Sequence, residues 1–173
     1  MLMPENKEII LGGGCFWCVE AVFQNIKGVT EVVSGYGGGV SPEPSYQSIG
    51  DHAEVIRVSY SSKTITLKEL LEIFFSVHDP TTKDRQGADI GSQYRSIVIC
   101  SKDEVEIVEQ SIRDAQRLWG KPIVTEIIID GKFFPAEDYH QDFYQQNQSS
   151  PYCQVVINPK LAKFRDKFSK YLK

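Results

Sequence analysis

Hydrophobic and polar residues alternate along this chain with two different periods, which divide it into strands and helices. Hydrophobic residues at every second position, or in short runs, predict strands, whereas spacings of three and four predict one-sided helices. Strands are expected at about 7–11, 29–36, 53–60, 95–100 and 125–130. Helices are expected at about 15–26, 67–77 and 103–119, with shorter ones near Asp138 and from Leu161. This mixture, with hairpin-like returns, indicates an α+β fold in which helices cover the faces of a sheet.

Two long loops separate these elements. The first is rich in Gly, Pro and Ser and ends at Gly50, and the second runs from His78 to Gln93. Compact domains rarely contain loops of this length unless their function requires them. We therefore expect functional residues in both loops.

The composition is that of one folded domain. The chain has 173 residues, of which 41% are hydrophobic and 24% are charged. These percentages are typical of globular proteins, and a chain of this length is long enough to bury a substantial core. The formal net charge is −4, and no run of Lys or Arg occurs before the C-terminal segment, so nucleic-acid binding is not expected.

The sequence also suggests where the protein works. The segment Met1–Asn6 has no basic stretch followed by an apolar one, so no secretory signal is expected. The apolar runs are far shorter than a helix that crosses a bilayer. We expect a cytoplasmic protein with no membrane contact, and a monomer as the simplest state.

Four cysteines in a chain of this size do not indicate a disulfide scaffold. In a cytosolic enzyme such a set more often serves metal binding or catalysis. Cys15 follows a glycine triplet and opens the predicted helix 15–26. Unpaired backbone N–H groups and the positive end of the helix dipole favour the thiolate there, and the thiolate is the reactive form. Cys15 is therefore the candidate nucleophile.

Helical spacing distinguishes Cys15 from the three residues that follow it. Extended backwards, the apolar stripe of this helix reaches Cys18 and Cys15, so Cys18 is expected to face the core as a small hydrophobic residue. Phe16 and Trp17 lie off the stripe and are expected to be exposed. Two adjacent exposed aromatic residues either pack against a neighbouring element or line a substrate pocket. The stripe consists of Val19, Val22, Phe23 and Ile26.

Glu54 is the second candidate for chemistry. Alternation in the strand 53–60 places Glu54 on the same face as Ile56 and Val58. A carboxyl group on an apolar face loses hydration, which raises its pKa and suits it to act as a general acid. A glutamate at a strand end can instead bend into solvent. The neighbouring His52 is more often structural than catalytic in such a position.

Several separated motifs follow one another along nearly the whole chain. In this order they resemble the A-type methionine sulfoxide reductases, the peptide-methionine (S)-S-oxide reductases. The resemblance implies one domain over residues 1–173, built as a two-layer α/β roll. Its sheet would be mixed and mostly antiparallel, with a ferredoxin-like split βαβ core. The motifs are Gly14-Cys15-Phe16-Trp17, Gly35-Tyr36-Gly37-Gly38-Gly39, Pro44-Ser45-Tyr46, His52-Ala53-Glu54-Val55, His78-Asp79-Pro80, Arg85-Gln86-Gly87, Asp89, Gly91-Ser92-Gln93-Tyr94-Arg95-Ser96 and Ala136-Glu137-Asp138-Tyr139-His140-Gln141.

The resemblance assigns a role to each residue of the site. Cys15 attacks the sulfur of methionine S-sulfoxide, while Phe16 and Trp17 hold the S-methyl group in an apolar pocket. Glu54 gives a proton to the sulfoxide oxygen. Tyr46 and Tyr94 donate hydrogen bonds to the same oxygen. Asp89 helps to form the polar side of the pocket.

The resemblance also implies how the enzyme is recycled. Cys15 becomes a sulfenic acid, and a second thiol condenses with it to a disulfide that thioredoxin or another dithiol reduces. Cys153 lies in a C-terminal extension from about residue 145, where the family keeps resolving cysteines, and is favoured over Cys18. Cys100 ends a predicted buried strand and is expected to be inert. No metal or organic cofactor is expected, and the substrates are oxidised proteins or peptides, with free methionine sulfoxide left open.

Two other classes of protein remain as alternatives. Cys15 and Cys18 form a C-x-x-C pair of the kind that thioredoxin-like dithiol oxidoreductases use. The two aromatic residues between them have no clear part in dithiol exchange. The same pair could form half of a zinc site, but Cys100 and Cys153 are too far apart in sequence to supply a second C-x-x-C.

Overall fold

The computed structural model describes residues 6–173, so the first five residues of the expected signal-free segment lie outside it. The strands are β1 Asn6–Gly13, β2 Val29–Gly37, β3 Ala53–Ser61, β4 Arg85–Gln86, β5 Asp89–Ile90, β6 Ser96–Cys100, β7 Glu126–Ile129 and β8 Phe133–Pro135. The α-helices are α1 Phe16–Phe23, α2 Leu67–Val77, α3 Val105–Gln116, α4 Phe143–Gln146 and α5 Asn158–Lys167. Short 3-10 helices cover Ser92–Tyr94, Lys102–Glu104, Asp138–His140 and Ser169–Tyr171, and a π-helical turn, η4, covers Cys153–Ile157.

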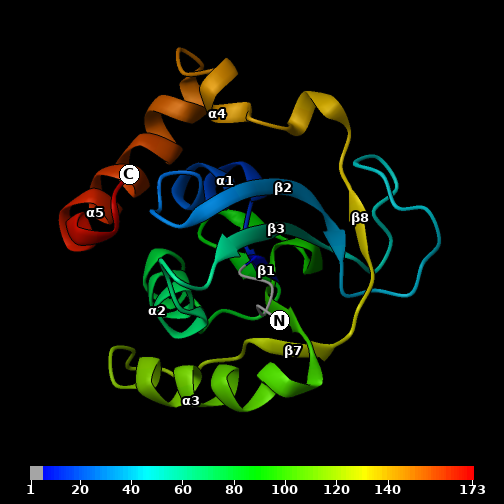
Figure 1. Cartoon of the computed structure of the whole chain (residues 1–173). Coiled ribbons are helices and arrows are strands. Elements are labelled where there is room, and N and C mark those ends of the chain that lie inside the picture. Colours follow the sequence, from blue (N-terminus) through cyan, green and yellow to red (C-terminus); the bar gives the residue numbers. More distant parts are fainter. Residues whose placement is uncertain (1–5) are drawn as a thin grey trace.

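Six strands form one curled sheet in the order β7-β6-β1-β3-β2-β8 (Figure 1). Strand β1 pairs antiparallel with β3 and β6, and β2 pairs antiparallel with β3 and β8, whereas β6 and β7 are parallel. Helix α1 connects β1 to β2, and β3 lies between these two strands. The predicted α+β class, with a mixed and mostly antiparallel sheet, is therefore confirmed.

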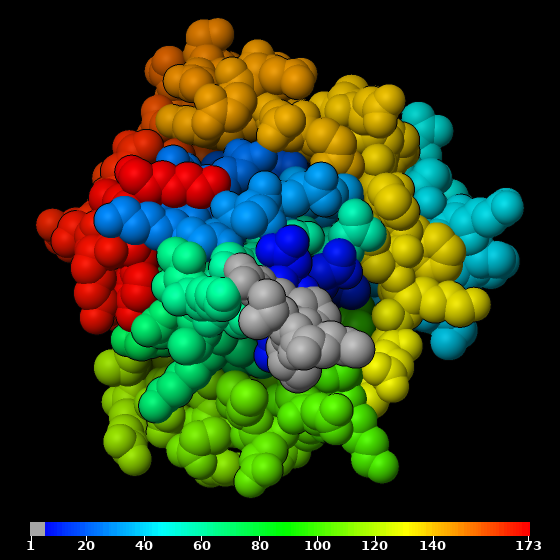
Figure 2. Space-filling view, in the orientation of Figure 1, coloured from blue at the N-terminus to red at the C-terminus, as the bar shows by residue number. Residues whose placement is uncertain are grey.

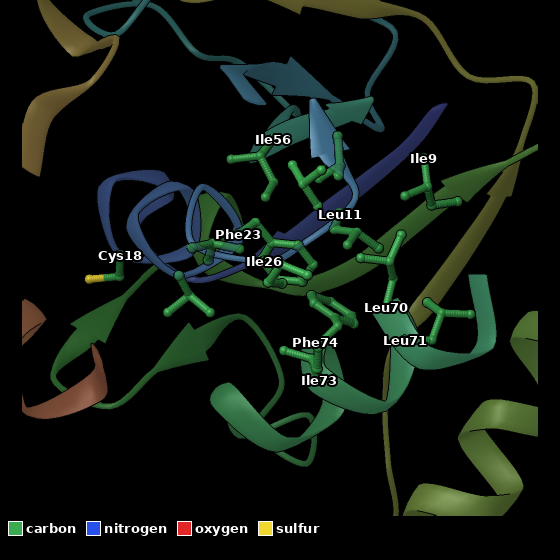
Figure 3. Packing of buried hydrophobic residues seen from close by; sticks show 14 of the residues in the cluster. Ile9, Leu11, Cys18, Phe23, Ile26, Ile56, Leu70, Leu71, Ile73 and Phe74 are labelled. Atoms are coloured by element: carbon green, nitrogen blue, oxygen red, sulfur yellow. The ribbon is translucent and has the colours of Figure 1, made fainter. Parts of the chain in front are cut away.

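The main core lies between one face of this sheet and helices α1, α2 and α5 (Figure 3). Apolar side chains of β1, such as Leu11, meet Phe23 of α1 and Phe74 of α2 there. A smaller cluster on the opposite face includes Val55 and Ile97. The first four residues of β3, 53–56, are buried on both faces of the strand, so Glu54 lies in a continuously buried stretch.

The predicted helices and strands differ from the structure mainly at their ends. The helix 67–77 has the predicted bounds because Thr66 and Glu69 form a capping box at its start. Helix α1 ends at Phe23, three residues before the predicted Ile26. The loop 78–93 contains the short hairpin of β4 and β5, and β8 and α4 were not predicted. These elements have two to four residues each, which is too short for a period to show.

The C-terminal third of the chain wraps around the start of the molecule. In Figure 2 the orange and red segments lie against the blue segment that contains α1 and β2. Helices α4 and α5 and the turn η4 all contact α1. Among residues 6–173, no helix is both long enough and apolar enough to cross a membrane.

Candidate active site

Glycines at the end of β1 bring the candidate nucleophile close to its neighbours. A Cβ atom on Gly12 would lie 2.6 Å from Ile97 Cγ2 and 2.9 Å from the carbonyl oxygen of Glu54. Gly14 has a φ of +93°, and a Cβ there would lie 2.6 Å from Cγ of Gln86. The strand end therefore passes closer to β3, β6 and the second loop than any side chain would allow. Cys15 follows immediately and is 9% exposed.

Glu54 lies directly beside the start of α1. Its Oε1 accepts a hydrogen bond of 3.1 Å from the backbone N–H of Phe16, and the side chain is only 3% exposed. Burial raises the pKa of Glu54 to about 7, and the negative charge of Asp89 acts in the same direction. The predicted burial of Glu54 on the apolar face is confirmed, and a carboxyl group in this setting retains a proton near neutral pH.

The two cysteines of the C-x-x-C pair are hydrogen-bonded to each other. This contact lowers the pKa of Cys18 to about 7, assisted by the charge of Lys160. The same contact, together with burial and the charge of Glu54, raises the pKa of Cys15. The helix-start N–H of Phe16 donates to Glu54, and the Cys15 thiol caps no helix N–H group. The expectation that the helix start holds Cys15 as thiolate is therefore wrong, because Glu54 takes up that donor.

Cys18 is in the core, as predicted, but it is also part of the reactive pair. It is 2% exposed, and Figure 3 shows its sulfur pointing away from the labelled apolar residues. The hydroxyl of Tyr152 lies 3.5 Å from this sulfur. Cys18 thus connects Cys15 to the C-terminal segment.

Phe16 and Trp17 form the wall of an aromatic cluster. Phe16 is 1% exposed, so the expectation that it is exposed is wrong. Its ring is covered by Tyr36 at 5.8 Å between centroids. Trp17 is half-buried and stacks on Phe143 with ring centroids 3.7 Å apart and planes at 7°. The two interpretations of this aromatic pair, packing against a neighbouring element and lining a pocket, are compatible, because the packed rings leave an apolar surface next to Cys15.

His140 lies at the centre of this cluster, and no role was predicted for it from the sequence. The indole N–H of Trp17 donates to His140 Nδ1 over 3.1 Å. Burial lowers the pKa of His140, so the ring is neutral and its proton lies on Nε2. That Nε2 is buried and has no hydrogen-bond partner among the described residues. It is an unused donor beside the rings of Phe16 and Tyr46, at 5.1 and 4.5 Å between centroids.

The two candidate tyrosines and Asp89 complete the site. Burial raises the pKa of Tyr94 to about 12, with further contributions from the charges of Glu54, Asp89, Tyr46 and Cys15. The pKa of Tyr46 is raised by burial and then by Glu54 and Cys15. The structure therefore brings these five residues from three separate segments within electrostatic range of one another.

The loop that carries Tyr46 is fixed by hydrogen bonds at its base. The Asp51 carboxylate accepts hydrogen bonds from the Ser41 hydroxyl and from the backbone N–H groups of Val40 and Ser41. These bonds, the one from the Ser41 hydroxyl most of all, hold the pKa of Asp51 well below its ordinary value. His52 accepts from Gly39 N–H and contacts the Ser41 carbonyl, a structural role as predicted. The Tyr46 N–H donates to Glu137 over 3.1 Å. Tyr46 remains 41% exposed, at the solvent side of the cluster.

Cys153 lies in η4, close to the site but fully buried. All four cysteines are free thiols. Cys153 is 0% exposed, and the residue before it, Tyr152, contacts Trp17 edge-on and Cys18 through its hydroxyl. Cys100 lies apart at the end of β6, where burial raises the pKa of its thiol to about 11. An inert role for Cys100 fits this position.

The arrangement offers a thiol, a protonated carboxyl group and phenol donors around one small apolar surface. Such a set can attack an electrophilic sulfur and protonate an oxygen that leaves it. Over residues 6–173, no group of three or more His, Cys, Asp or Glu side chains is placed to hold a metal ion. The zinc-site alternative therefore has no support in the described part of the chain.

Comparison with known proteins agrees with this chemistry. A family model described as "Peptide methionine sulfoxide reductase" matches residues 7–172. The chain is 50% identical over 163 residues to the peptide methionine sulfoxide reductase MsrA of Sulfolobus acidocaldarius, covering 91% of this chain and 93% of that one. The crystal structure of Mxr1 from Saccharomyces cerevisiae in reduced form has a TM-score of 0.79 and 36% identity, covering 86% and 90%. The structure of Mxr1 in complex with Trx2 has a TM-score of 0.60 and 30% identity, covering 79% and 84%.

These matches extend far beyond the motif around Cys15. The matched range, residues 7–172, contains every residue of the site described above. Identity of 50% over nine-tenths of the chain is far above what a shared fold alone would give. The chain therefore belongs to the peptide methionine sulfoxide reductase family, in its A type.

Proposed function

We propose that the residues around Cys15 reduce methionine S-sulfoxide in oxidised proteins and peptides to methionine. The observation that carries this is the position of Glu54, a buried carboxyl group with a pKa of about 7 beside the nucleophile. Reduction of a sulfoxide needs a thiolate to attack sulfur, which Cys15 becomes when its proton passes to Cys18, and a proton for oxygen, which Glu54 supplies. The family assignment replaces the thioredoxin-like alternative.

In the first step, Cys15 passes its proton along the hydrogen bond to Cys18 and attacks the substrate sulfur. Glu54 protonates the sulfoxide oxygen, with Tyr46 and Tyr94 donating hydrogen bonds. The bond that this attack forms between the two sulfurs then breaks together with the sulfur–oxygen bond of the substrate, and the oxygen passes to the Cys15 sulfur, which becomes a sulfenic acid. The methionine sulfur is reduced by two electrons, and Cys15 is oxidised by two. Phe16 and Trp17 hold the S-methyl group, and Asp89 lines the polar side.

In the second step, a thiol attacks the Cys15 sulfenic acid, a disulfide forms and water leaves. We propose Cys153 as this thiol. The contact of the neighbouring Tyr152 with Cys18 supports it, because that contact holds the C-terminal segment against the pair. Cys18 is the alternative, favoured by its hydrogen bond to Cys15. Thioredoxin then reduces the disulfide, in line with the complex between Mxr1 and Trx2.

The direct test is turnover of a peptide that contains methionine sulfoxide, resolved by sulfur epimer, with thioredoxin or dithiothreitol as reductant. We expect loss of the S epimer only, and no turnover by Cys15→Ser. Turnover of the R epimer alone, or activity that survives Cys15→Ser, would contradict the proposal. Free methionine sulfoxide, run in parallel, shows whether the peptide is required.

Two serine variants separate the candidate resolving thiols. Cys153→Ser should release one equivalent of methionine per enzyme and then stop cycling with thioredoxin. Cys18→Ser should continue to cycle, with a slower first step because Cys15 has lost its proton acceptor. Full cycling by Cys153→Ser would transfer the resolving role to Cys18.

The remaining proposals concern the whole chain. We take residues 1–173 as one catalytic domain with an extension from about 145, acting as a cytoplasmic monomer without metal or organic cofactor. The steps described above need only the thiols, the Glu54 carboxyl group and the tyrosine hydroxyls of the chain, which supports a reaction without metal or organic cofactor. The position of β3 between β1 and β2 supports a ferredoxin-like split βαβ core within a two-layer roll.

A further inference from the structure

A second buried glutamate lies one turn along α1 from the nucleophile, and the proposed mechanism does not use it. Glu20 is 0% exposed. Its Oε2 accepts from the Ser34 hydroxyl at 3.0 Å, and its Oε1 accepts from the backbone N–H of Phe143 at 3.2 Å. A buried carboxyl group with a donor on each oxygen is held in place by these hydrogen bonds, which offset the cost of its burial.

The segment that Glu20 holds is also clamped to the sheet. The side-chain amide of Gln141 pairs with both backbone groups of Ser34, at 2.9 Å for each hydrogen bond. Between these two attachments, Asp142 has a φ of +53°, in the left-handed region that non-glycine residues rarely adopt. Such a conformation persists where the surroundings determine it from several sides. The chain direction at Phe143 is therefore set by Gln141 on one side and Glu20 on the other.

Phe143 is where this segment meets the substrate pocket. Its ring stacks on Trp17, with centroids 3.7 Å apart, and Trp17 is in turn fixed through its indole N–H to His140. Glu20 and Trp17 both lie on α1. The helix therefore contacts Phe143 twice, through the Glu20 carboxyl at its backbone and through the Trp17 ring at its side chain. A shift of the Phe143 backbone would tilt the wall that Trp17 offers to the substrate.

We infer that Glu20 is a positioning residue, whose carboxylate holds the Phe143 backbone and so sets the Trp17 wall of the methionine sulfoxide pocket. The inference rests on the proposed function, since it assigns Trp17 to the S-methyl group. A pocket wall contributes to substrate binding more than to the chemical step. The inference therefore concerns KM, whereas Glu54 acts on the rate of reduction.

The test uses Glu20→Gln, which keeps the size of the side chain but turns one acceptor oxygen into a donor. We expect KM for an S-sulfoxide peptide to rise about tenfold, the effect of one lost hydrogen bond to a charged group. The single-turnover rate at saturation should stay within about twofold. Glu20→Asp keeps the charge but has a shorter side chain, so its KM should lie between those of wild type and Glu20→Gln. If Glu20→Gln does not fold, Glu20→Asp takes its place in the test.

A double-mutant cycle with Phe143→Ala shows whether Glu20 acts through the ring. Once the ring is absent, Glu20→Gln should raise KM by less than about twofold. The same tenfold rise in both backgrounds would overturn the inference, and so would no rise in either.

Trp17 supplies a readout that does not depend on activity. The chain has two tryptophans, so Trp119→Phe leaves Trp17 as the only indole emitter. Glu20→Gln in this background should change the Trp17 emission, and an unchanged spectrum would contradict the inference. If wild-type protein turned over no sulfoxide, the proposed function would fail, while the spectrum would still test the positioning.

Gln24→Ala is the matched control. Gln24 is the C-cap residue of α1, four residues after Glu20, and its amide also donates to this segment, at Asp142 Oδ1. That contact is exposed and does not reach the Phe143 backbone. KM and the Trp17 emission should both remain at wild-type values, and a change equal to that of Glu20→Gln would overturn the inference.

Discussion

Two buried glutamates lie near the start of α1, Glu20 within the helix and Glu54 on the neighbouring strand β3, and their difference shows what makes a carboxyl group reactive. Burial raises the pKa of both Glu20 and Glu54 to about 7. Glu20 accepts a hydrogen bond on each oxygen, from the Ser34 hydroxyl and the Phe143 backbone N–H. Glu54 accepts one, from Phe16, and otherwise faces the two tyrosines and Cys15. Equal burial thus gives a positioning group in one place and an available proton in the other.

The largest expected effect separates the two in the chemical step. Glu54→Gln keeps the shape of the side chain but removes the proton donor, so the single-turnover rate should fall about 10²–10⁴-fold. Alkylation of Cys15 by iodoacetamide serves as the control and should change little. A rate within a few-fold of wild type would remove Glu54 as the acid.

In stability the two glutamates should behave alike. The pKa of each rises from 4.5 in the unfolded chain to about 7 in the folded one. Between these values the folded state binds more protons, so the stabilisation is fully present below about pH 4.5 and lost as pH rises through 7. Each carboxyl group should contribute about 3 kcal/mol to this change, an order-of-magnitude figure.

Urea unfolding at pH 5 and pH 8 measures that change. The buried His78, whose pKa is lowered to about 4, titrates in the opposite sense over part of this range. The quantity to compare is therefore the difference between wild type and Glu20→Gln or Glu54→Gln. A variant with the wild-type pH dependence would show that its glutamate has an ordinary pKa in the folded state.

The pH dependence of catalysis should distinguish the glutamates again. Protonated Glu54 is required, so the single-turnover rate should fall about tenfold for each pH unit above 7. This falling limb should be absent from the residual rate of Glu54→Gln and unchanged in Glu20→Gln. The measurement is rapid quench with a saturating peptide from pH 6 to 9. If Glu20→Gln lost the limb, the assignment of the acid would be wrong.

The smallest expected effect comes from one of the donors to Glu20. Ser34→Ala removes the hydroxyl that contacts Oε2, at a cost of about 1–3 kcal/mol in unfolding free energy at pH 8. At pH 5 Glu20 is protonated and needs its donors less, so the cost should be smaller. Equal losses at both pH values would indicate that Ser34 contributes through packing.

Much of the fold could be predicted because several segments carry a strong period. Helix 67–77 has a wide apolar stripe and its own capping box, and its bounds were correct at both ends. Alternation also placed Glu54 on the buried face. The family motifs identified the residues that meet at the site, which lie in three segments and share no local pattern.

Other features depend on long-range packing and had no signal in the sequence. The exposure expected for Phe16 was wrong, because Tyr36 and His140 cover its ring from distant segments. The thiolate expected at Cys15 was wrong, because the N–H group of Phe16 at the helix start donates to Glu54, 38 positions further along the chain. His140 joins the site through contacts with distant residues, among them the hydrogen bond from Trp17, 123 residues away.

The glycine-lined end of β1 has a consequence for how activity is lost on heating. This strand is central and paired on both sides, so its amide hydrogens should exchange with solvent only when the whole domain opens. Cys153 itself is buried, but residues 145–150 before it lie at the surface, so this segment should open at lower temperature. Warming would then first yield an enzyme that repairs one methionine and stalls, and only later one that repairs none.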